Sequence, residues 1–244
     1  VEKLKEKIEK NEKINEIEIA VLGSYVPLNR SEIIVKKLLN YKSSCVLFND
    51  LIDLQIKEPL KEKELMKSLT SLNEIMDPVS KKVREQYEEN PYPRWRYTNK
   101  NPKNNFLSIL NNNIYPNKII SNIKNLKRNI LIAGCGTGQQ LVSKASYDNS
   151  DILAVDLSLS SLSFAKRKMQ ELNHSNIEFL HGDILNLKNL NRKFSVIECV
   201  GVLHHLKDPE KGLEILLDIL MPKGYLKLGL YSEFARKHIV ETRE

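Results

Sequence analysis

From residue 129 onward, short apolar runs alternate with longer amphipathic stretches, and this rhythm restricts the fold more than any other feature of the 244-residue chain. The apolar runs are 129–133, 151–155, 177–180, 194–200 and 224–231. The stretches between them that have a helical pattern are 138–146, 159–172 and 209–220. Strands that alternate with helices predict βαβ units, and right-handed crossovers between such units build a doubly wound, mostly parallel α/β sheet.

The first part of the chain has a different pattern. Helical patterns recur along it, at residues 31–40, 61–69 and 79–89, while residues 45–48 read as a short strand or a buried turn. Three prolines and several asparagines in EENPYPRWRYTNKNPKNN then mark an irregular boundary. We therefore expect a mainly helical region over residues 1–104, with a lid or linker at 83–104, and a Rossmann-like domain over residues 105–244.

Composition excludes several classes of protein. Hydrophobic residues make up 41% of the chain and charged residues 28%, which is neither a disordered nor a fibrous composition. No apolar run approaches the roughly 20 residues of a membrane helix, so we expect no membrane insertion. The three cysteines are far apart and lack metal-ligand spacing, which predicts free thiols in the cytoplasm and no metal site.

The net charge of +7 is concentrated in residues 81–128, which hold eleven Lys or Arg and three Glu. No nucleic-acid motif accompanies this charge, and Lys, Asn and Ile are abundant throughout, so we interpret it as a solvated surface rather than a nucleic-acid site. The chain starts at Val1 and ends in a helical pattern that has not stopped. We therefore expect a fragment of a longer protein, with its helical region available for substrate docking or for forming a homodimer.

A glycine-rich loop follows the first predicted strand. Gly134, Gly136 and Gly138 allow a sharp turn and a close approach of the backbone to a ligand, at the start of a helix whose free N–H groups face that ligand. A dinucleotide fingerprint would need a further glycine where this chain has Gln139. The spacing therefore favours another adenosyl cofactor over NAD.

Two aspartates follow the next two predicted strands. Asp156 lies twenty residues beyond Gly136 and could accept both hydroxyls of a ribose, while Asp183 could accept the amine of adenine with the Ile184 N–H on the ring. The alternative role for each aspartate is to cap a helix or turn. Because three such features fall at the carboxyl ends of successive strands, where open α/β sheets bind ligands, we expect a bound adenosyl cofactor.

The segments ILIAGCGTG, AVDLS, HGDIL and IECVGVLHHLKDP resemble, in order, the motifs of class I S-adenosylmethionine-dependent methyltransferases over residues 129–232. The resemblance implies S-adenosylmethionine as cofactor, and a sheet that lacks its last two strands here. It implies these cofactor-binding residues: Gly134, Cys135, Gly136, Gly138, Asp156, Leu157, Asp183, Ile184, Glu198 and Cys199.

One position departs from that family's pattern. Many members carry an acidic residue two positions before the first glycine, and this chain has Ile132. Backbone carbonyls near Cys199, or the Glu198 carboxylate, are the alternatives for holding the methionine ammonium.

VREQYEENPYPRW, at residues 83–95, resembles a segment that precedes the methyltransferase domain in certain bacterial proteins, often joined to tetratricopeptide repeats. The layout, with LYSEFAR at 230–236, is similar to that of bacterial outer-membrane-protein lysine methyltransferases. This resemblance implies a protein lysine side chain as the methyl acceptor.

Aromatic and imidazole side chains supply the candidates for chemistry. We expect catalytic roles for Tyr92, Trp95 and His204. We expect substrate contacts from Tyr87, Arg94, His205 and Tyr231. Adjacent histidines at a helix start cannot both face one way, so one of them is structural. The alternative for the aromatic residues is packing, with residues 83–104 fastening the helical region to the sheet.

Three functions therefore remain open. The first is a methyltransferase that acts on a protein, with lysine as the acceptor, and the second is a methyltransferase for a small molecule. The third is a non-catalytic domain that binds the cofactor or a partner, for which Ile132 is the support.

Overall fold

The structure is a computed structural model and describes residues 2–10, 12–98, 105–114, 116, 127–147, 149–232 and 234–243. The chain divides into two compact units, residues 1–67 and residues 68–244. The predicted domain boundary at residue 104 lies next to residues outside the described part, so this boundary stays a prediction. The two further strands expected for the sheet also stay a prediction. Among the described residues, no helix combines the length and the apolar character needed to cross a membrane.

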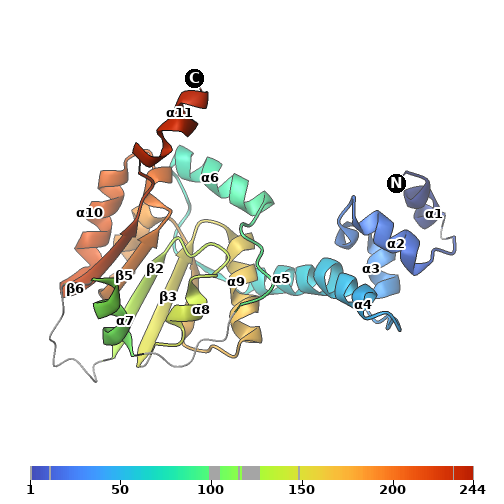
Figure 1. Cartoon of the computed structure of the whole chain (residues 1–244), viewed down its shortest axis with the longest axis horizontal. Coiled ribbons are helices and arrows are strands. Elements are labelled where there is room, and N and C mark those ends of the chain that lie inside the picture. Colours follow the sequence, from blue (N-terminus) through green and yellow to red (C-terminus); the bar gives the residue numbers. More distant parts are fainter. Residues whose placement is uncertain are drawn as a thin grey trace. The chain divides into compact units, whose positions relative to one another are not determined.

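The first unit is helical (Figure 1). Its elements are α1 (Glu2–Glu9), α2 (Glu16–Gly23), η1 (Leu28–Arg30), α3 (Glu32–Leu38), α4 (Val46–Ile52), η2 (Asp53–Lys57) and α5 (Glu58–Lys67). Its core is mainly aliphatic and includes Leu22, Leu28, Ile52 and Ile56 beside Phe48. The short strand or buried turn predicted at 45–48 is wrong, because helix α4 begins there with Val46 exposed and only Phe48 buried.

The described residues of the second unit form a six-stranded sheet in which every pairing is parallel. The strands are β1 (Thr70–Ser71), β2 (Arg128–Ala133), β3 (Ser150–Asp156), β4 (Ile177–His181), β5 (Phe194–Val200) and β6 (Leu220–Gly229), in the order β1-β4-β3-β2-β5-β6. The order reverses beside β2, so the doubly wound, Rossmann-like α/β prediction is confirmed.

Both faces of this sheet are covered. Along β2, Ile130 and Ile132 belong to one hydrophobic cluster, and Leu131 and Ala133 belong to another. The first cluster includes side chains of α7 (Phe106–Asn113), α8 (Leu141–Lys144) and α9 (Leu159–Glu171). The second includes side chains of η3 (Ile184–Leu190), η4 (Leu203–His205) and α10 (Pro209–Ile219). Burial on two faces explains why the strand sequences are continuous apolar runs.

The remaining described elements are α6 (Pro78–Glu89), η5 (Phe234–Arg236) and α11 (Lys237–Arg243). Figure 1 shows α6 near the end of the sheet at which the strands finish. Helix α6 contacts both α9 and η4, which follow β3 and β5. It therefore lies next to the edge of the sheet where a ligand of an open α/β fold binds.

Candidate active site

A cavity of about 300 Å³ lies at the carboxyl ends of the central strands. Its walls come from the loops that follow β2, β3, β4 and β5, and from α6 and the segment after it. The lining residues are Ser80, Val83, Tyr87, Tyr92, Pro93, Gly134, Cys135, Gly136, Thr137, Gln139, Gln140, Asp156, Leu157, Ser161, Gly182, Asp183, Ile184, Val200, Gly201, Val202, His205 and Leu206. The volume is within the range of small-molecule sites.

The three loop glycines have left-handed φ angles but different surroundings. A Cβ at Gly134 would lie 2.3 Å from Val202 Cγ2, and one at Gly138 would lie 2.7 Å from Ala165 Cβ. A Cβ at Gly136, where φ is +52°, would meet nothing nearer than the Tyr92 carbonyl oxygen at 3.9 Å. Gly134 and Gly138 therefore permit close packing, whereas Gly136 leaves open space on the cavity wall.

Asp156 ends β3 and is tied to the glycine loop. Its Oδ2 accepts a hydrogen bond from the Gly136 N–H at 2.7 Å, and its Oδ1 accepts one from the Ser158 N–H at 3.0 Å. Burial raises the pKa of Asp156 despite these two backbone donors. The carboxylate is thus fixed in the cavity wall, with lone pairs left for hydroxyl donors of a ligand.

Asp183 serves as a cap and lines the cavity at once. Its Oδ1 accepts a hydrogen bond from the Leu185 N–H at 2.9 Å, at the start of η3. Its side chain is buried, and both Asp183 and Ile184 line the cavity. The capping role is therefore present, and the contact with adenine stays a prediction for a side chain that already lines the cavity.

Glu198 and Cys199 lie on β5 behind the cavity wall. The Glu198 carboxylate lies 2.8 Å from Lys144 Nζ, and both side chains are less than a tenth exposed. Burial raises the pKa of the Cys199 thiol to about 12. Burial also raises the pKa of the Cys135 thiol, which does line the cavity. Both cysteines are therefore protonated at neutral pH and act as small buried side chains.

Three of the residues predicted to act in catalysis or to contact the substrate come together at the cavity. They come from α6, from the segment after it and from η4. Tyr87 on α6, Tyr92 and His205 on η4 all line it, and the Tyr87 and His205 rings meet edge to face at 6.4 Å between centroids. Burial raises the pKa of Tyr87 and lowers the pKa of His205. At neutral pH this wall therefore carries a protonated phenol and a neutral imidazole.

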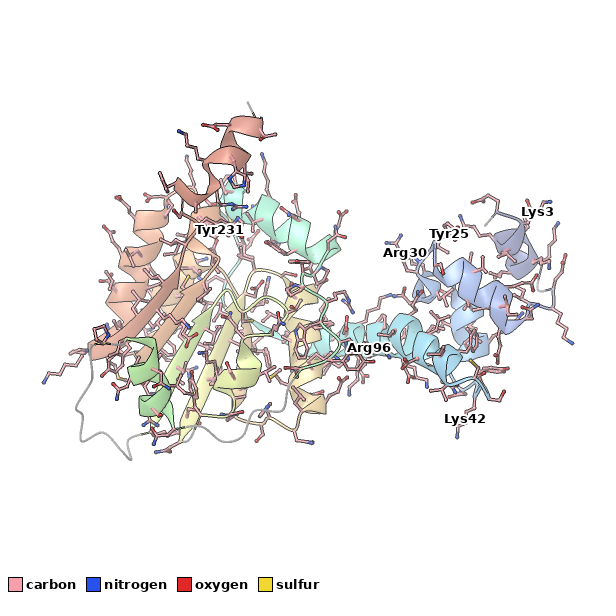
Figure 2. All side chains as sticks on the ribbon, viewed as in Figure 1. Lys3, Tyr25, Arg30, Lys42, Arg96 and Tyr231 are labelled. Carbon is pink, nitrogen blue, oxygen red and sulfur yellow. The ribbon has the colours of Figure 1, made fainter. Side chains whose placement is uncertain are left out.

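His204 and Tyr231 form a second layer. The His204 ring lies 4.3 Å from that of His205 and 4.2 Å from that of Tyr231. Tyr231 follows β6 (Figure 2). Neither ring nitrogen of His204 has a hydrogen-bond partner among the described residues. The Arg236 guanidinium lies over the Tyr231 ring, 3.9 Å from its centroid. His204 therefore packs behind the wall that His205 forms.

Trp95 and Arg94 point away from the cavity. Trp95 is 8% exposed and meets the Phe164 ring edge to face at 6.0 Å. The Arg94 guanidinium lies over the same Phe164 ring at 4.7 Å. Both side chains thus contact α9, and the structure separates them from Tyr92.

Sequence reasoning missed several lining residues. Gly201 and Val202 directly follow β5, so the rule that placed Asp156 and Asp183 would have found them. Ser80 and Val83 line the cavity from α6, and nothing in their own sequence points to a ligand. No cluster of three or more His, Cys, Asp or Glu side chains within the described ranges could hold a metal ion.

Comparison with known proteins finds one family match and several partial relatives. Residues 130–224 match a family described as a methyltransferase domain. An uncharacterised protein of Synechococcus is 38% identical over 117 residues, 47% of this chain and 28% of that protein. The mitochondrial ubiquinone biosynthesis O-methyltransferase of Schizosaccharomyces pombe is 31% identical over 107 residues, 43% of this chain and 38% of that protein. Among solved structures, PKMT2 from Rickettsia typhi is 32% identical, covering 40% of this chain and 20% of that one, with a TM-score of 0.38. The chain spans well under half the length of each of these proteins.

The residues present suit an adenosyl cofactor. Gly136 leaves a cradle that a Cβ would fill, and two carboxylates stand at the ends of β3 and β4 on the cavity wall. This donor set fits ribose hydroxyls and an adenine amine. Residues 130–224, the part of the chain that matches the methyltransferase domain family, therefore carry a donor set for S-adenosylmethionine as cofactor.

Proposed function

We propose that the protein is an enzyme that transfers a methyl group from S-adenosylmethionine to a nucleophile by in-line displacement. One observation carries this proposal: a single cavity joins the glycine loop, Asp156 and Asp183 to a wall built by Tyr87, Tyr92 and His205. The bound cofactor supplies an electrophilic methyl group on a sulfonium. The protein's main contribution is to hold the nucleophile, carbon and sulfur in line with water excluded.

We assign the cofactor side as follows. The backbone at 134–136 approaches the methionine and ribose, and Asp156 accepts hydrogen bonds from the ribose hydroxyls. Asp183 accepts a hydrogen bond from the adenine amine, and the Ile184 N–H donates one to the adenine ring. Glu198 is held by Lys144, which favours backbone carbonyls near Cys199 for the methionine ammonium. The site thus needs no acid at the position of Ile132, which is fully buried.

On the acceptor side, elimination favours His205 as the group that takes up a proton. Asp156 and Asp183 accept backbone hydrogen bonds, and Cys135 and Tyr87 have raised pKa values. The His205 imidazole is neutral at pH 7 and reaches the cavity wall, whereas His204 lies behind it. We therefore give the catalytic role expected for His204 to His205, and give His204 and Tyr231 the role of positioning that ring.

For the acceptor we propose a protein lysine side chain. Only the uncharged amine attacks. Burial against a partly apolar wall lowers the pKa of an amine, and the aromatic ring faces attract the cation that approaches before it loses its proton. Tyr92 is 75% exposed and lines the cavity, so it can contact a substrate that remains largely outside. We propose that the helical unit helps to dock this protein or pairs two copies, and that the enzyme acts in the cytoplasm, where its three free cysteines stay reduced.

A small-molecule acceptor is the second candidate, and one observation favours it. The S. pombe relative is named an O-methyltransferase of ubiquinone biosynthesis and is 31% identical to this chain over 107 residues. A phenol-like hydroxyl would also give its proton to a neutral imidazole at His205.

The test is transfer of labelled methyl from S-adenosylmethionine into a cell extract divided into protein and small-molecule fractions. Acid-precipitable label that appears as methyllysine after hydrolysis supports the protein acceptor. Label confined to the small-molecule fraction supports the alternative. Saturable binding of S-adenosylhomocysteine without transfer into either fraction contradicts an enzyme and leaves the non-catalytic binding domain.

A further inference from the structure

We infer that Trp95 and Thr137 are positioning residues for the cofactor, because they fasten one wall of the cavity to the glycine loop. This inference rests on the proposed function of that cavity. The wall is the segment 91–97, which we call the strap and which follows α6 without regular secondary structure. Trp95 lies outside residues 130–224, the part of the chain that matches the methyltransferase family.

Two hydrogen bonds join the strap to the loop. Thr137 Oγ1 donates to the Pro93 carbonyl at 2.6 Å, and Trp95 Nε1 donates to the Thr137 carbonyl at 3.0 Å. Thr137 is 1% exposed and Trp95 is 8% exposed, so both bonds are shielded from water. One loop residue therefore holds the strap at two points through a donor and an acceptor, an arrangement that we call the latch.

The far side of the strap is anchored to α9. The Trp95 ring packs edge to face on Phe164, and Lys168 Nζ lies 5.4 Å from the Trp95 ring centroid. Lys168 Nζ also donates to the Arg96 carbonyl at 3.3 Å. These contacts fix Trp95 on α9, while the latch connects it to the loop that approaches the cofactor.

The latch holds the strap in the position where it forms one wall of the cavity. Tyr92 and Pro93 line the cavity, and the Tyr92 carbonyl oxygen is the nearest atom to the open face of Gly136. A ligand between Gly136 and the strap meets both walls only when the strap is closed. The apparent affinity of that ligand is therefore proportional to the fraction of molecules in which the strap is closed. The two latch hydrogen bonds raise this fraction.

The experiment compares Thr137→Val with Thr137→Ser by calorimetric titration with S-adenosylhomocysteine. Valine keeps the branched shape but removes the O–H donor, so we expect Kd to rise about tenfold, the effect of losing one shielded hydrogen bond. Serine keeps the donor and should restore near wild-type binding. Trp95→Phe, which keeps a ring but removes the Nε1–H, should weaken binding like Thr137→Val.

Ser195→Ala is the matched control. It removes a comparable hydrogen bond, from Ser195 Oγ to the Asn129 carbonyl, near the amino end of β5 and outside the cavity lining. We expect its Kd to equal that of the wild type. A Thr137→Val protein that is folded and binds as tightly as the wild type overturns the latch and leaves the proposed function standing. Failure of the folded wild type to bind at all overturns both.

A second measurement needs no variant. Because a ligand that prefers the closed strap must also stabilise it, saturating S-adenosylhomocysteine should slow tryptic cleavage after Arg94 and Arg96. Cleavage sites within residues 1–67 provide the internal reference. The emission of Trp95, the only tryptophan, should change in the same titration. Unchanged cleavage at both arginines under saturating ligand contradicts the inference even if Thr137→Val fails to fold.

Discussion

Lys144 Nζ lies 2.8 Å from the Glu198 carboxylate, and this ion pair is buried between α8 and β5. Lys144 Nζ also donates to the Tyr147 hydroxyl at 2.8 Å. Burial opposes the charged form of Lys144, but Glu198 and Tyr147 outweigh it and raise its pKa. The pair therefore connects α8, the helix after the glycine loop, to β5. On the neighbouring strand β2, the residue paired with Glu198 is Ile132.

Lys144→Met should destabilise the fold, because it leaves the Glu198 carboxylate buried without a cation. We expect a loss of about 3–5 kcal/mol in the free energy of unfolding. The double variant Lys144→Met/Glu198→Leu should recover most of that loss. Urea unfolding measures both changes. The control is Lys127→Met, which breaks an exposed pair with Asp151 and should cost less than about 1 kcal/mol. Equal losses for the two methionine variants would contradict the account.

Gly134→Ala and Gly136→Ala should separate stability from binding. Both positions have left-handed φ angles, which cost about 1–2 kcal/mol for a residue with a Cβ. At Gly134 the new Cβ also collides with Val202, whereas at Gly136 it enters the cavity. We expect Gly134→Ala to have the lower melting temperature and Gly136→Ala to have the weaker affinity for S-adenosylhomocysteine among folded protein. The reverse order would show that Gly136 does not face the ligand.

His205→Asn should slow methyl transfer about a hundredfold, the usual effect of removing a general base. Binding of S-adenosylhomocysteine should change less than twofold. Burial lowers the pKa of His205, so the ratio of the wild-type rate to the His205→Asn rate, in which the titration of the acceptor cancels, should hold through pH 6.5 and fall only below it, as the imidazole becomes protonated. The rate is measured with the acceptor found in the extract experiment, and His204→Asn is the control. An equal loss in both variants would argue against His205 as the proton acceptor.

His204→Phe should stabilise the protein by about 1 kcal/mol, because it replaces two buried nitrogens that lack partners in the described structure and keeps a ring against Tyr231. Burial lowers the pKa of His204, so the wild type loses stability as pH falls below the usual value of 6.5. The phenylalanine variant lacks that loss, and its advantage should grow from pH 7 to pH 5. Thermal unfolding at several pH values checks this, and a lower melting temperature at pH 7 would contradict it.

The sheet and the cofactor side of the site could be predicted from the sequence, because apolar periodicity sets the strands and position at a strand end sets Asp156 and Asp183. Strand β1 could not be predicted, since its two residues become a strand only by pairing with β4. The predicted helix at 138–146 is reduced to α8, because Gly138 still belongs to the loop with φ at +77°.

The acceptor side depended on orientations that a sequence does not carry. Which of His204 and His205 faces the cavity is set by how η4 packs on α6. From the sequence, Trp95 could line the site or pack behind it. In the structure its Nε1–H donates to the Thr137 carbonyl, and this hydrogen bond holds the ring in the packed position. The Lys144–Glu198 ion pair could not be predicted from the sequence, because the two residues lie on different elements, 54 positions apart.

We predict that the cavity binds S-adenosylmethionine with Asp156 on the ribose. Asp156→Asn tests this, because the amide keeps the size of the side chain but replaces one acceptor oxygen with an N–H donor. Both Asp156 oxygens accept backbone hydrogen bonds, from the Gly136 and Ser158 N–H groups, so the amide nitrogen of the variant faces one of these donors. Removal of a carboxylate whose charge is disfavoured by burial offsets part of that loss, and affinities are therefore compared between proteins shown to be folded.

The most direct measurement is calorimetric titration of the wild type, Asp156→Asn and the control Asp151→Asn with S-adenosylhomocysteine. Asp151 lies exposed at the other end of β3. We expect saturable binding by the wild type and Asp151→Asn, and a loss of more than tenfold in Asp156→Asn, since a neutral amide cannot accept from both ribose hydroxyls as a carboxylate does. Equal affinity of all three proteins, or no binding by a folded wild type, would contradict the account.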